Sequence, residues 1–212
     1  MRLTRSSFAA LLPTLSAVAV TALPLAASAH VGVDGAAHDH AGFLQGFVHP
    51  FTGLDHLAAM VAVGLWSALV ARSTRDLLWA PLGFAAMLLA GALAGLAGVQ
   101  IPAVEPMIAA SLLAIGLLAA TRLRLPGPVA AGVVGVFAVF HGAAHGYELS
   151  GGHGAGIQGA LLAVAGMVLA TALLHAAGIA SGWTLRRRGA WLPRAAGAAV
   201  ALFGAVLLAP LV

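Results

Sequence analysis

The sequence predicts an all-α membrane protein: a compact bundle of about six transmembrane helices that follows a cleaved signal peptide. Of the 212 residues, 61% are hydrophobic and only 8% are charged. Together with a mean hydropathy of +1.02, these values are typical of membrane proteins. Apolar segments long enough to cross a bilayer alternate with short polar breaks. Cysteine is absent, which excludes disulfides, thiolate metal ligands and thiol catalysis.

Residues 1–29 have the features of a secretory signal peptide. Two arginines precede an apolar run, and Ala27-Ser28-Ala29 has the small-residue pattern of a cleavage site. The alternative is an uncleaved first transmembrane helix, which is disfavoured because the run is shorter than the usual span of about 20 residues. The mature chain then divides into a periplasmic segment rich in His and Asp (30–48) and a six-helix transmembrane domain (49–212).

Six apolar segments of the mature chain are expected to cross the membrane, with prolines clustered near their ends. The expected spans are 50–71, 78–98, 104–121, 127–147, 157–181 and 191–210. Residues 41–48 form a short apolar approach, either interfacial or continuous with the first helix. Glycines at small-xxx-small spacing, such as Gly91 with Gly95, predict closely packed helices.

The arginines predict the orientation of these spans. With the mature N-terminus outside, the first, third and fifth connections face the cytoplasm, and every arginine after the signal peptide lies in or directly beside them. These residues are Arg72, Arg75, Arg122, Arg124, Arg186, Arg187, Arg188 and Arg194. This distribution follows the positive-inside rule and predicts a bacterial inner-membrane protein with both mature termini in the periplasm. The high pI, near 11.4, therefore reflects the arginines that set the orientation in the membrane. No nucleic-acid partner is expected.

Four tryptophans flank the connections assigned to the cytoplasm and are expected to be interfacial anchors. They are Trp66, Trp79, Trp183 and Trp191.

The stretch "HPFTGLDHLAAM" at 49–60 places ionisable residues at the start of the first span. A helix that begins near Pro50 would put His49, Gly53, His56 and Met60 on one stripe. Asp55 would be turned by about 100° from His56. Its carboxylate could reach the same site from the side, or it could orient a ligating imidazole.

The stretch "HGAAHGYE" at 141–148 forms a second cluster near the end of the fourth span. His141, His145 and Glu148 fall at i, i+4 and i+7 on one helix face. Because the first and fourth spans run in opposite directions, both clusters are expected at the outer side. Four imidazoles and two carboxylates suit Ni²⁺, Co²⁺ or Zn²⁺. Structural polar packing is the alternative, disfavoured because a charge in the bilayer centre costs about 2.5–3.5 kcal/mol.

Two further groups of histidines lie apart from these motifs. The segment after the signal peptide carries a candidate metal-capture group of His30, His38, Asp39 and His40, with a solvated polar spacer as an equally weighted alternative. His175 lies deep in the fifth span, near the cytoplasmic side. Interhelical hydrogen bonding is favoured for it over a role as an exit ligand.

The stretches "GFVHPFTGLDHLAAMVAVGLW" and "FHGAAHGYE" closely resemble the two hallmark motifs of the HupE/UreJ family, membrane proteins associated with nickel and cobalt supply for hydrogenase and urease. The resemblance implies a secondary permease with Ni²⁺ or Co²⁺ as its substrate, no organic cofactor, and hydrogenase or urease maturation proteins as indirect partners. It implies a metal path through His49, Asp55, His56, His141, His145 and Glu148. One departure is the long "HVGVDGAAHDHAG" before the first motif.

Other classes of protein remain open at this point. An intramembrane zinc hydrolase could use the same cluster with a bound water, and a b-type haem protein could use paired imidazoles. A membrane protein could also store or sense metal without transporting it. No P-loop is present, so the chain has no ATPase motif of its own, and transport rather than enzymatic activity is expected.

Overall fold

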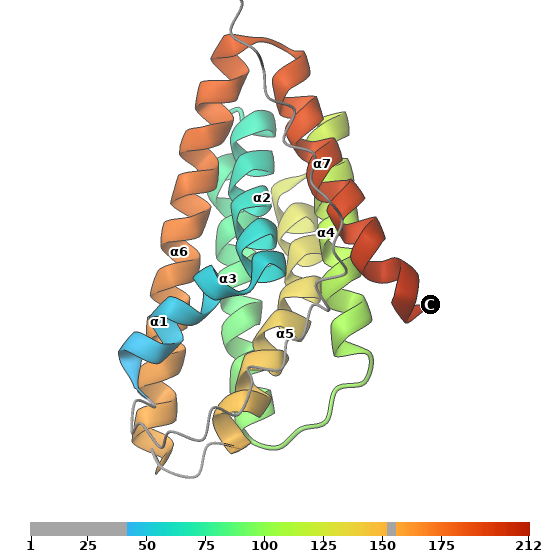
Figure 1. Cartoon of the computed structure of the whole chain (residues 1–212). Coiled ribbons are helices and arrows are strands. Elements are labelled where there is room, and N and C mark those ends of the chain that lie inside the picture. Colours follow the sequence, from blue (N-terminus) through green and yellow to red (C-terminus); the bar gives the residue numbers. More distant parts are fainter. Residues whose placement is uncertain (1–41, 152–155) are drawn as a thin grey trace, which may run out of the picture. The chain divides into compact units, whose positions relative to one another are not determined.

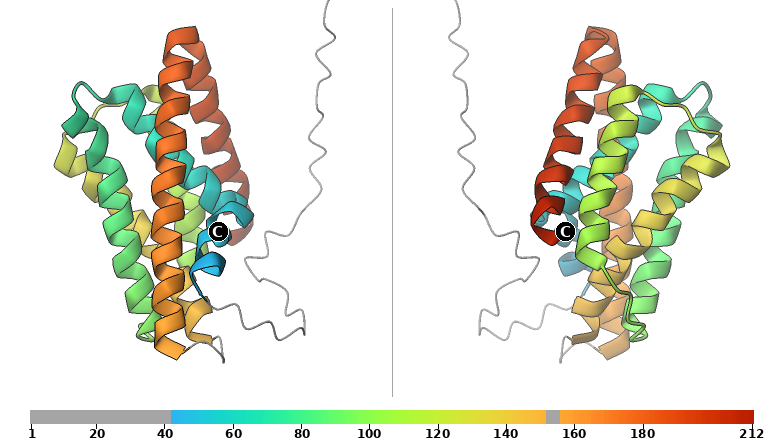
Figure 2. Two further views of the ribbon diagram at one scale, coloured as in Figure 1. Left: turned by 90° about the vertical axis from the view of Figure 1, so that its left-hand side faces the viewer. Right: turned by 90° about the vertical axis from the view of Figure 1, so that its right-hand side faces the viewer.

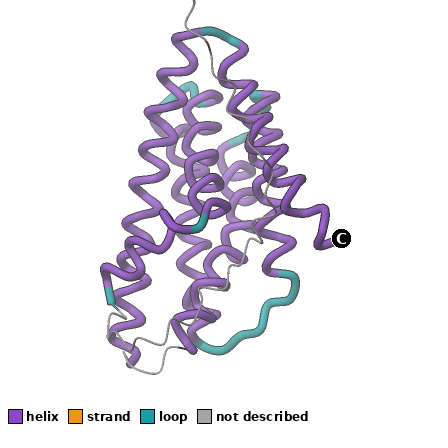
Figure 3. The backbone as a smooth tube through the Cα atoms, in the orientation of Figure 1, coloured by secondary structure: helices purple, strands orange, loops and turns teal. Residues whose placement is uncertain are grey.

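The computed structural model describes residues 42–151 and 156–212. The predicted signal peptide (1–29) and the His- and Asp-rich residues 30–41 lie outside this range. The elements in chain order are α1 (Phe43–Thr52), α2 (Leu54–Val70), α3 (Thr74–Leu96), α4 (Val104–Thr121), α5 (Gly127–Gly151), α6 (Gly156–Arg188), α7 (Trp191–Leu208) and the 3₁₀ helix η1 (Ala209–Leu211). Figure 3 shows only helices and short connections in this part of the chain, as expected for the all-α class.

The long helices form an up-and-down bundle around α2 (Figure 1). Helix α3 packs along α5, α4 along α7, and α2 along α6, while α1 lies against α6. Helix α2 also contacts α3, α4 and α7, and most of its residues are buried. It is therefore the central helix, and side chains on any of its faces are enclosed by protein.

Five of the helices are long and apolar enough to cross a membrane, and the number rises to six if the bent pair α1 and α2 is counted as one span. This agrees with the predicted number of spans. Helix α6 is longer than expected, with 33 residues. Its last turn holds three consecutive arginines, which continue the helix beyond the apolar segment.

The first span is not one straight helix. Helices α1 and α2 meet at an angle of 85°, and Gly53 between them has extended backbone angles. Pro50 lies in the last turn of α1 instead of starting the helix. The predicted single stripe of His49, Gly53, His56 and Met60 is therefore wrong, because the first two residues precede the bend and the last two follow it.

Close helix contacts occur where glycine removes a side chain. A Cβ atom at Gly46 of α1 would overlap the backbone carbonyl of Ala163 on α6. A Cβ atom at Gly91 of α3 would overlap the carbonyl of Val139 on α5. These contacts agree with the small-residue packing that the sequence predicts for helices in lipid.

The arginines gather at one end of the bundle. Helices α2, α4 and α6 all end there, as the two views in Figure 2 show, and the arginines of the described residues lie in or beside the connections at this end. Trp183 and Trp191 are 49% and 68% exposed near the same end, as interfacial anchors require. Trp66 is buried and donates a hydrogen bond from Nε1 to the Leu123 carbonyl at 3.0 Å. Its prediction as an anchor is wrong because it belongs to the central helix.

Candidate metal site

Four histidines from three helices lie in ring contact. Helix α1 contributes His49, α2 contributes His56, and α5 contributes His141 and His145. The ring of His145 lies 4.5 Å from that of His49 and 4.6 Å from that of His56, between centroids. The rings of His56 and His141 are 4.8 Å apart. The structure thus brings the two sequence motifs together in one group of imidazoles, called here the histidine cluster.

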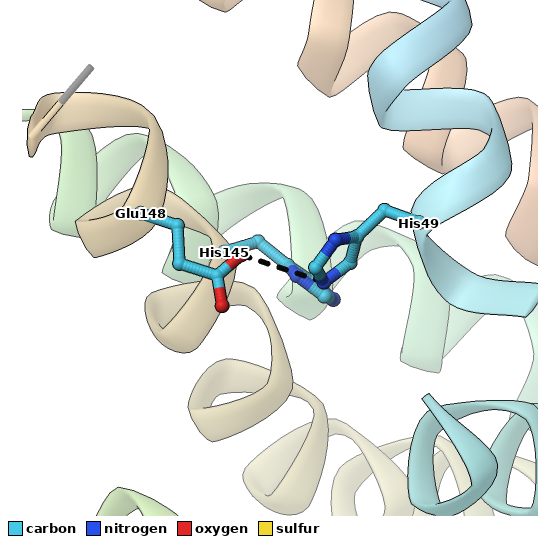
Figure 4. A group of neighbouring side chains, drawn as sticks. All are labelled: His49, His145 and Glu148. Carbon is cyan, nitrogen blue, oxygen red and sulfur yellow. Dashed lines mark ion pairs between the residues drawn. The ribbon is translucent and has the colours of Figure 1, made fainter. Parts of the chain in front are cut away.

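The outer edge of the histidine cluster includes a carboxylate. Oε2 of Glu148 lies 3.4 Å from Nε2 of His49, and Figure 4 shows the Glu148 and His145 side chains on α5 facing His49 on α1. One ligand atom from each of these three residues lies within 4.8 Å of the others. Ligand atoms about 2.1 Å from one ion are about 3–4.2 Å apart. A slight closure of α1 on α5 would therefore let the three side chains share an ion.

These three residues also line a small cavity between α1, α5 and α6. The cavity has a volume of about 50 Å³ and includes Gln45 and Met167 in its wall. This volume is large enough for an ion with one water molecule, since a water occupies about 30 Å³ in the liquid. The cavity provides an approach to the histidine cluster from the side of Glu148, whose side chain is 41% exposed.

Asp55 holds His56 in place. Its Oδ1 accepts a hydrogen bond from the His56 backbone N–H at 2.8 Å and lies 2.9 Å from Nδ1 of the same residue. If Nδ1 carries the proton, the Nε2 lone pair of His56 is left free. A carboxylate that fixes an imidazole in this way is a common partner of metal-binding histidines. Of the two roles weighed from the sequence, the geometry matches that of an orienting group.

Ser111 on α4 holds His141 in a similar way. The Ser111 hydroxyl donates to the Ile108 carbonyl at 2.6 Å and lies 2.9 Å from Nε2 of His141. Because the hydroxyl has one proton and donates it to the carbonyl, it accepts from an Nε2–H of His141. The Nδ1 lone pair of His141 is then free. The sequence does not predict this role for Ser111, since a lone serine within an apolar helix follows no motif.

Three buried ring nitrogens in the histidine cluster find no hydrogen-bond partner among the residues that the structure describes. They are Nε2 of His56, Nδ1 of His141 and Nε2 of His145. Buried polar groups in proteins are normally paired, and an unpaired one costs about 1–3 kcal/mol. Purely structural packing would not gather three such atoms. Unpaired imidazole nitrogens are suitable ligands for a borderline divalent ion. Among the described residues, ligand atoms of His49, His145 and Glu148 already lie within 4.8 Å of one another.

The remaining predicted residues fall elsewhere. His30, His38, Asp39 and His40 lie outside the described residues. His175 is buried on α6, and its Nε2 also has no hydrogen-bond partner within residues 42–151 and 156–212. The interhelical hydrogen bond favoured for it from the sequence is therefore not seen at this atom.

Comparison with known proteins connects this arrangement to a family. The family described as HupE / UreJ protein matches residues 18–207. The chain belongs to the HupE/UreJ family. Protein HupE from Rhizobium leguminosarum bv. viciae is 42% identical over 194 residues, which cover 90% of this chain and 94% of the relative. No solved structure matches the chain. The HupE/UreJ match spans both histidine motifs and confirms the resemblance drawn from them.

Proposed function

We propose that this HupE/UreJ protein is a secondary transporter that takes up Ni²⁺ or Co²⁺ across the bacterial inner membrane through the histidine cluster. The observation that carries the proposal is the convergence of four imidazoles with three unpaired, buried ring nitrogens. His49, His56, His141 and His145 would bind the ion directly. Glu148 would share it at the outer edge, and Asp55 would orient His56.

The distribution of charge supports a periplasmic position for the histidine cluster. The arginines lie at the end of the bundle where α2, α4 and α6 terminate. His56, near the start of α2, and His145, near the end of α5, lie toward the opposite end. The positive-inside rule assigns the arginine end to the cytoplasm, so an ion from the periplasm would meet Glu148 and His49 first.

The membrane potential can drive such uptake. A divalent cation that moves inward across a potential of about −100 mV gains roughly 4.6 kcal/mol, twice the value for one charge. Imidazole and carboxylate ligands bind borderline ions less tightly than thiolates do, which favours release. We infer a sequence of capture at Glu148 and His49, binding among the four imidazoles, and release inward after a helix rearrangement. The delivered metal would serve nickel enzymes such as hydrogenase or urease.

The zinc hydrolase alternative has less support from the geometry. Such an enzyme needs a metal with an open position beside a substrate cleft. The cavity at the histidine cluster measures about 50 Å³, whereas clefts for organic ligands are usually about 300–1,000 Å³. The size favours an ion as the substrate.

Accumulation of radioactive metal tests the proposal. Cells that lack other nickel and cobalt uptake systems would express the wild type, His56→Ala or Gly132→Ala, with membrane amounts matched by immunoblot. Gly132 on α5 is the control, because a Cβ atom there would meet nothing within 4 Å. We expect wild type and Gly132→Ala to accumulate ⁶³Ni or ⁵⁷Co at low external metal, and His56→Ala to fall to the level of the empty vector. Equal accumulation by wild type and His56→Ala would refute transport through the cluster.

We also propose that residues 30–40 capture metal before it enters the cluster, based on their three histidines and Asp39. Replacement of His30, His38 and His40 by Ser should raise the external concentration needed for half-maximal uptake and leave the maximal rate unchanged. An identical concentration dependence would show that the segment is only a spacer.

A further inference from the structure

His175 lies deeper in the bundle than the histidine cluster. It is 3% exposed on α6, and a Cβ atom at Gly64 of α2 would overlap its backbone carbonyl. Gly64 lies eight residues after His56 on the same helix, a rise of about 12 Å at 1.5 Å per residue. An ionisable side chain at this depth is costly and usually functional, and the permeation site proposed above makes no use of it.

Phe84 on α3 links His175 to the histidine cluster. The Phe84 ring is fully buried, and its centroid lies 5.6 Å from the ring of His141 and 5.3 Å from the ring of His175. The two histidines are thus separated by one aromatic side chain. An apolar ring between two imidazoles would hinder the direct passage of an ion from one to the other.

Two side chains with weak ligand atoms lie about one helical turn from the level of His175. Thr171 is one helical turn before it on α6, so the two side chains share a face. The Thr171 hydroxyl donates to the Met167 carbonyl at 2.9 Å and lies 3.4 Å from Sδ of Met60. Met60 is one turn after His56 on α2. An imidazole, a hydroxyl and a thioether therefore lie at neighbouring levels between α2 and α6.

We propose that His175, with Met60 and Thr171, forms a transit site that receives the metal ion from the histidine cluster when the Phe84 ring moves aside. The inference rests on the proposed transport function. One imidazole with two weak ligands holds Ni²⁺ or Co²⁺ less tightly than four imidazoles do. A permeation path needs such a site, since an ion must bind well enough to enter and weakly enough to leave.

A cavity at the arginine end lies beyond the level of His175 along α2. Ser67 lies one turn after Gly64 on α2, is 2% exposed, and its hydroxyl has no hydrogen-bond partner among the residues described. It lines a cavity of about 270 Å³ whose wall also includes Asp76, Arg72 and Arg124. The two guanidinium groups outnumber the one carboxylate. A cation that arrives there is therefore not retained, as release to the cytoplasm requires.

Substitutions of His175 that keep its packing test the transit site. Leu and Met have similar volumes and both fill apolar sites well, but only Met offers a sulfur ligand. We expect His175→Leu to lower ⁶³Ni uptake by about tenfold or more and His175→Met to lower it less. Equilibrium dialysis of the purified variants should show unchanged Ni²⁺ affinity at the histidine cluster.

The results separate a transit site from a structural role. Uptake by His175→Leu equal to wild type would overturn the inference, and so would equal losses in the Leu and Met variants. If His56→Ala transports normally, the proposed function fails instead, whatever the His175 variants do. Should His175→Leu not accumulate in the membrane, Met60→Leu replaces it as the test. It removes the thioether with little change in volume and is expected to slow uptake about threefold or more; an unchanged rate would contradict the transit site.

Discussion

The imidazole rings of His49 and His145 meet edge to face, with centroids 4.5 Å apart and an interplanar angle of 89°. The contact joins α1 to α5 and depends on the bend at Gly53. A straight helix through α1 and α2 would carry His49 about two turns beyond His56 along the α2 axis. The bend instead turns α1 across α6, so that His49 faces His145 and Glu148 and closes the outer side of the cluster.

Gly53→Ala should weaken metal binding. Alanine is favoured over glycine in a helix by about 1 kcal/mol, which promotes a continuous helix across the bend. A Cβ atom there would also lie 3.1 Å from Oδ1 of Asp55 and 3.3 Å from Nδ1 of His56. We expect a loss of about tenfold or more in Ni²⁺ affinity of the purified protein, by analogy with other changes around metal ligands.

Gly132→Ala is the control for this substitution. Gly132 lies within α5, and a Cβ atom at this position would meet nothing within 4 Å. Its Ni²⁺ affinity should match that of the wild type. If Gly53→Ala also binds Ni²⁺ as the wild type does, the bend is not needed for the site.

Substitutions of Asp55 distinguish orientation of His56 from direct ligation. Asp55→Ala removes the acceptor of the His56 ring proton, so the imidazole can rotate or change tautomer. Ni²⁺ affinity should fall by about 10–100-fold. Asp55→Asn keeps an oxygen acceptor and should lose less affinity. If Asp55→Asn loses as much Ni²⁺ affinity as Asp55→Ala does, the carboxylate itself binds the ion.

Ser111→Ala should destabilise the metal-free protein. The substitution leaves the Nε2–H of His141 buried without its acceptor, at a cost of about 1–3 kcal/mol. Thermal unfolding in detergent, followed by intrinsic tryptophan fluorescence, should show a lower midpoint than in the wild type. Ser181→Ala is the control, because its exposed hydroxyl donates to the Ala177 carbonyl of the same helix. Equal midpoints for Ser111→Ala and the wild type would remove the reason to assign the His141 tautomer.

Single cysteines test the orientation in the membrane, since the chain has none of its own. Pro102 lies in the α3–α4 connection and Ala190 in the α6–α7 connection, and both are exposed. A membrane-impermeant maleimide should label Pro102→Cys in spheroplasts, and Ala190→Cys only after the membrane is permeabilised. The reverse pattern would place the histidine cluster on the cytoplasmic side.

The number and order of the helices could be predicted from the sequence because lipid imposes strict conditions. Every backbone polar group within the membrane must be paired internally, so long apolar segments become helices. The convergence of the two motifs followed from the alternating direction of the spans. The spacing of His141, His145 and Glu148 along the chain also predicted that they lie on one helix, and the structure places all three on α5.

Features that depend on packing between helices could not be predicted in this way. Proline is common in the first turn of a helix, so the sequence predicts a helix start at Pro50, whereas Pro50 lies in the last turn of α1. The contact of Gly46 with Ala163 fixes α1 against α6. No local sequence pattern predicts this contact. Ser111 and Phe84 acquire roles only because the fold places them against His141.

The position of a bound ion is the most direct test of the histidine cluster. Crystals or vitrified particles of the purified protein would be prepared with Co²⁺ or Ni²⁺, and the metal located by anomalous scattering or by density together with X-ray absorption. We predict an ion bound by nitrogen from His56, His141 and His145, with His49 or Glu148 completing the shell. An ion bound elsewhere with these imidazoles unliganded, or absorption spectra without imidazole scattering, would contradict the proposed site.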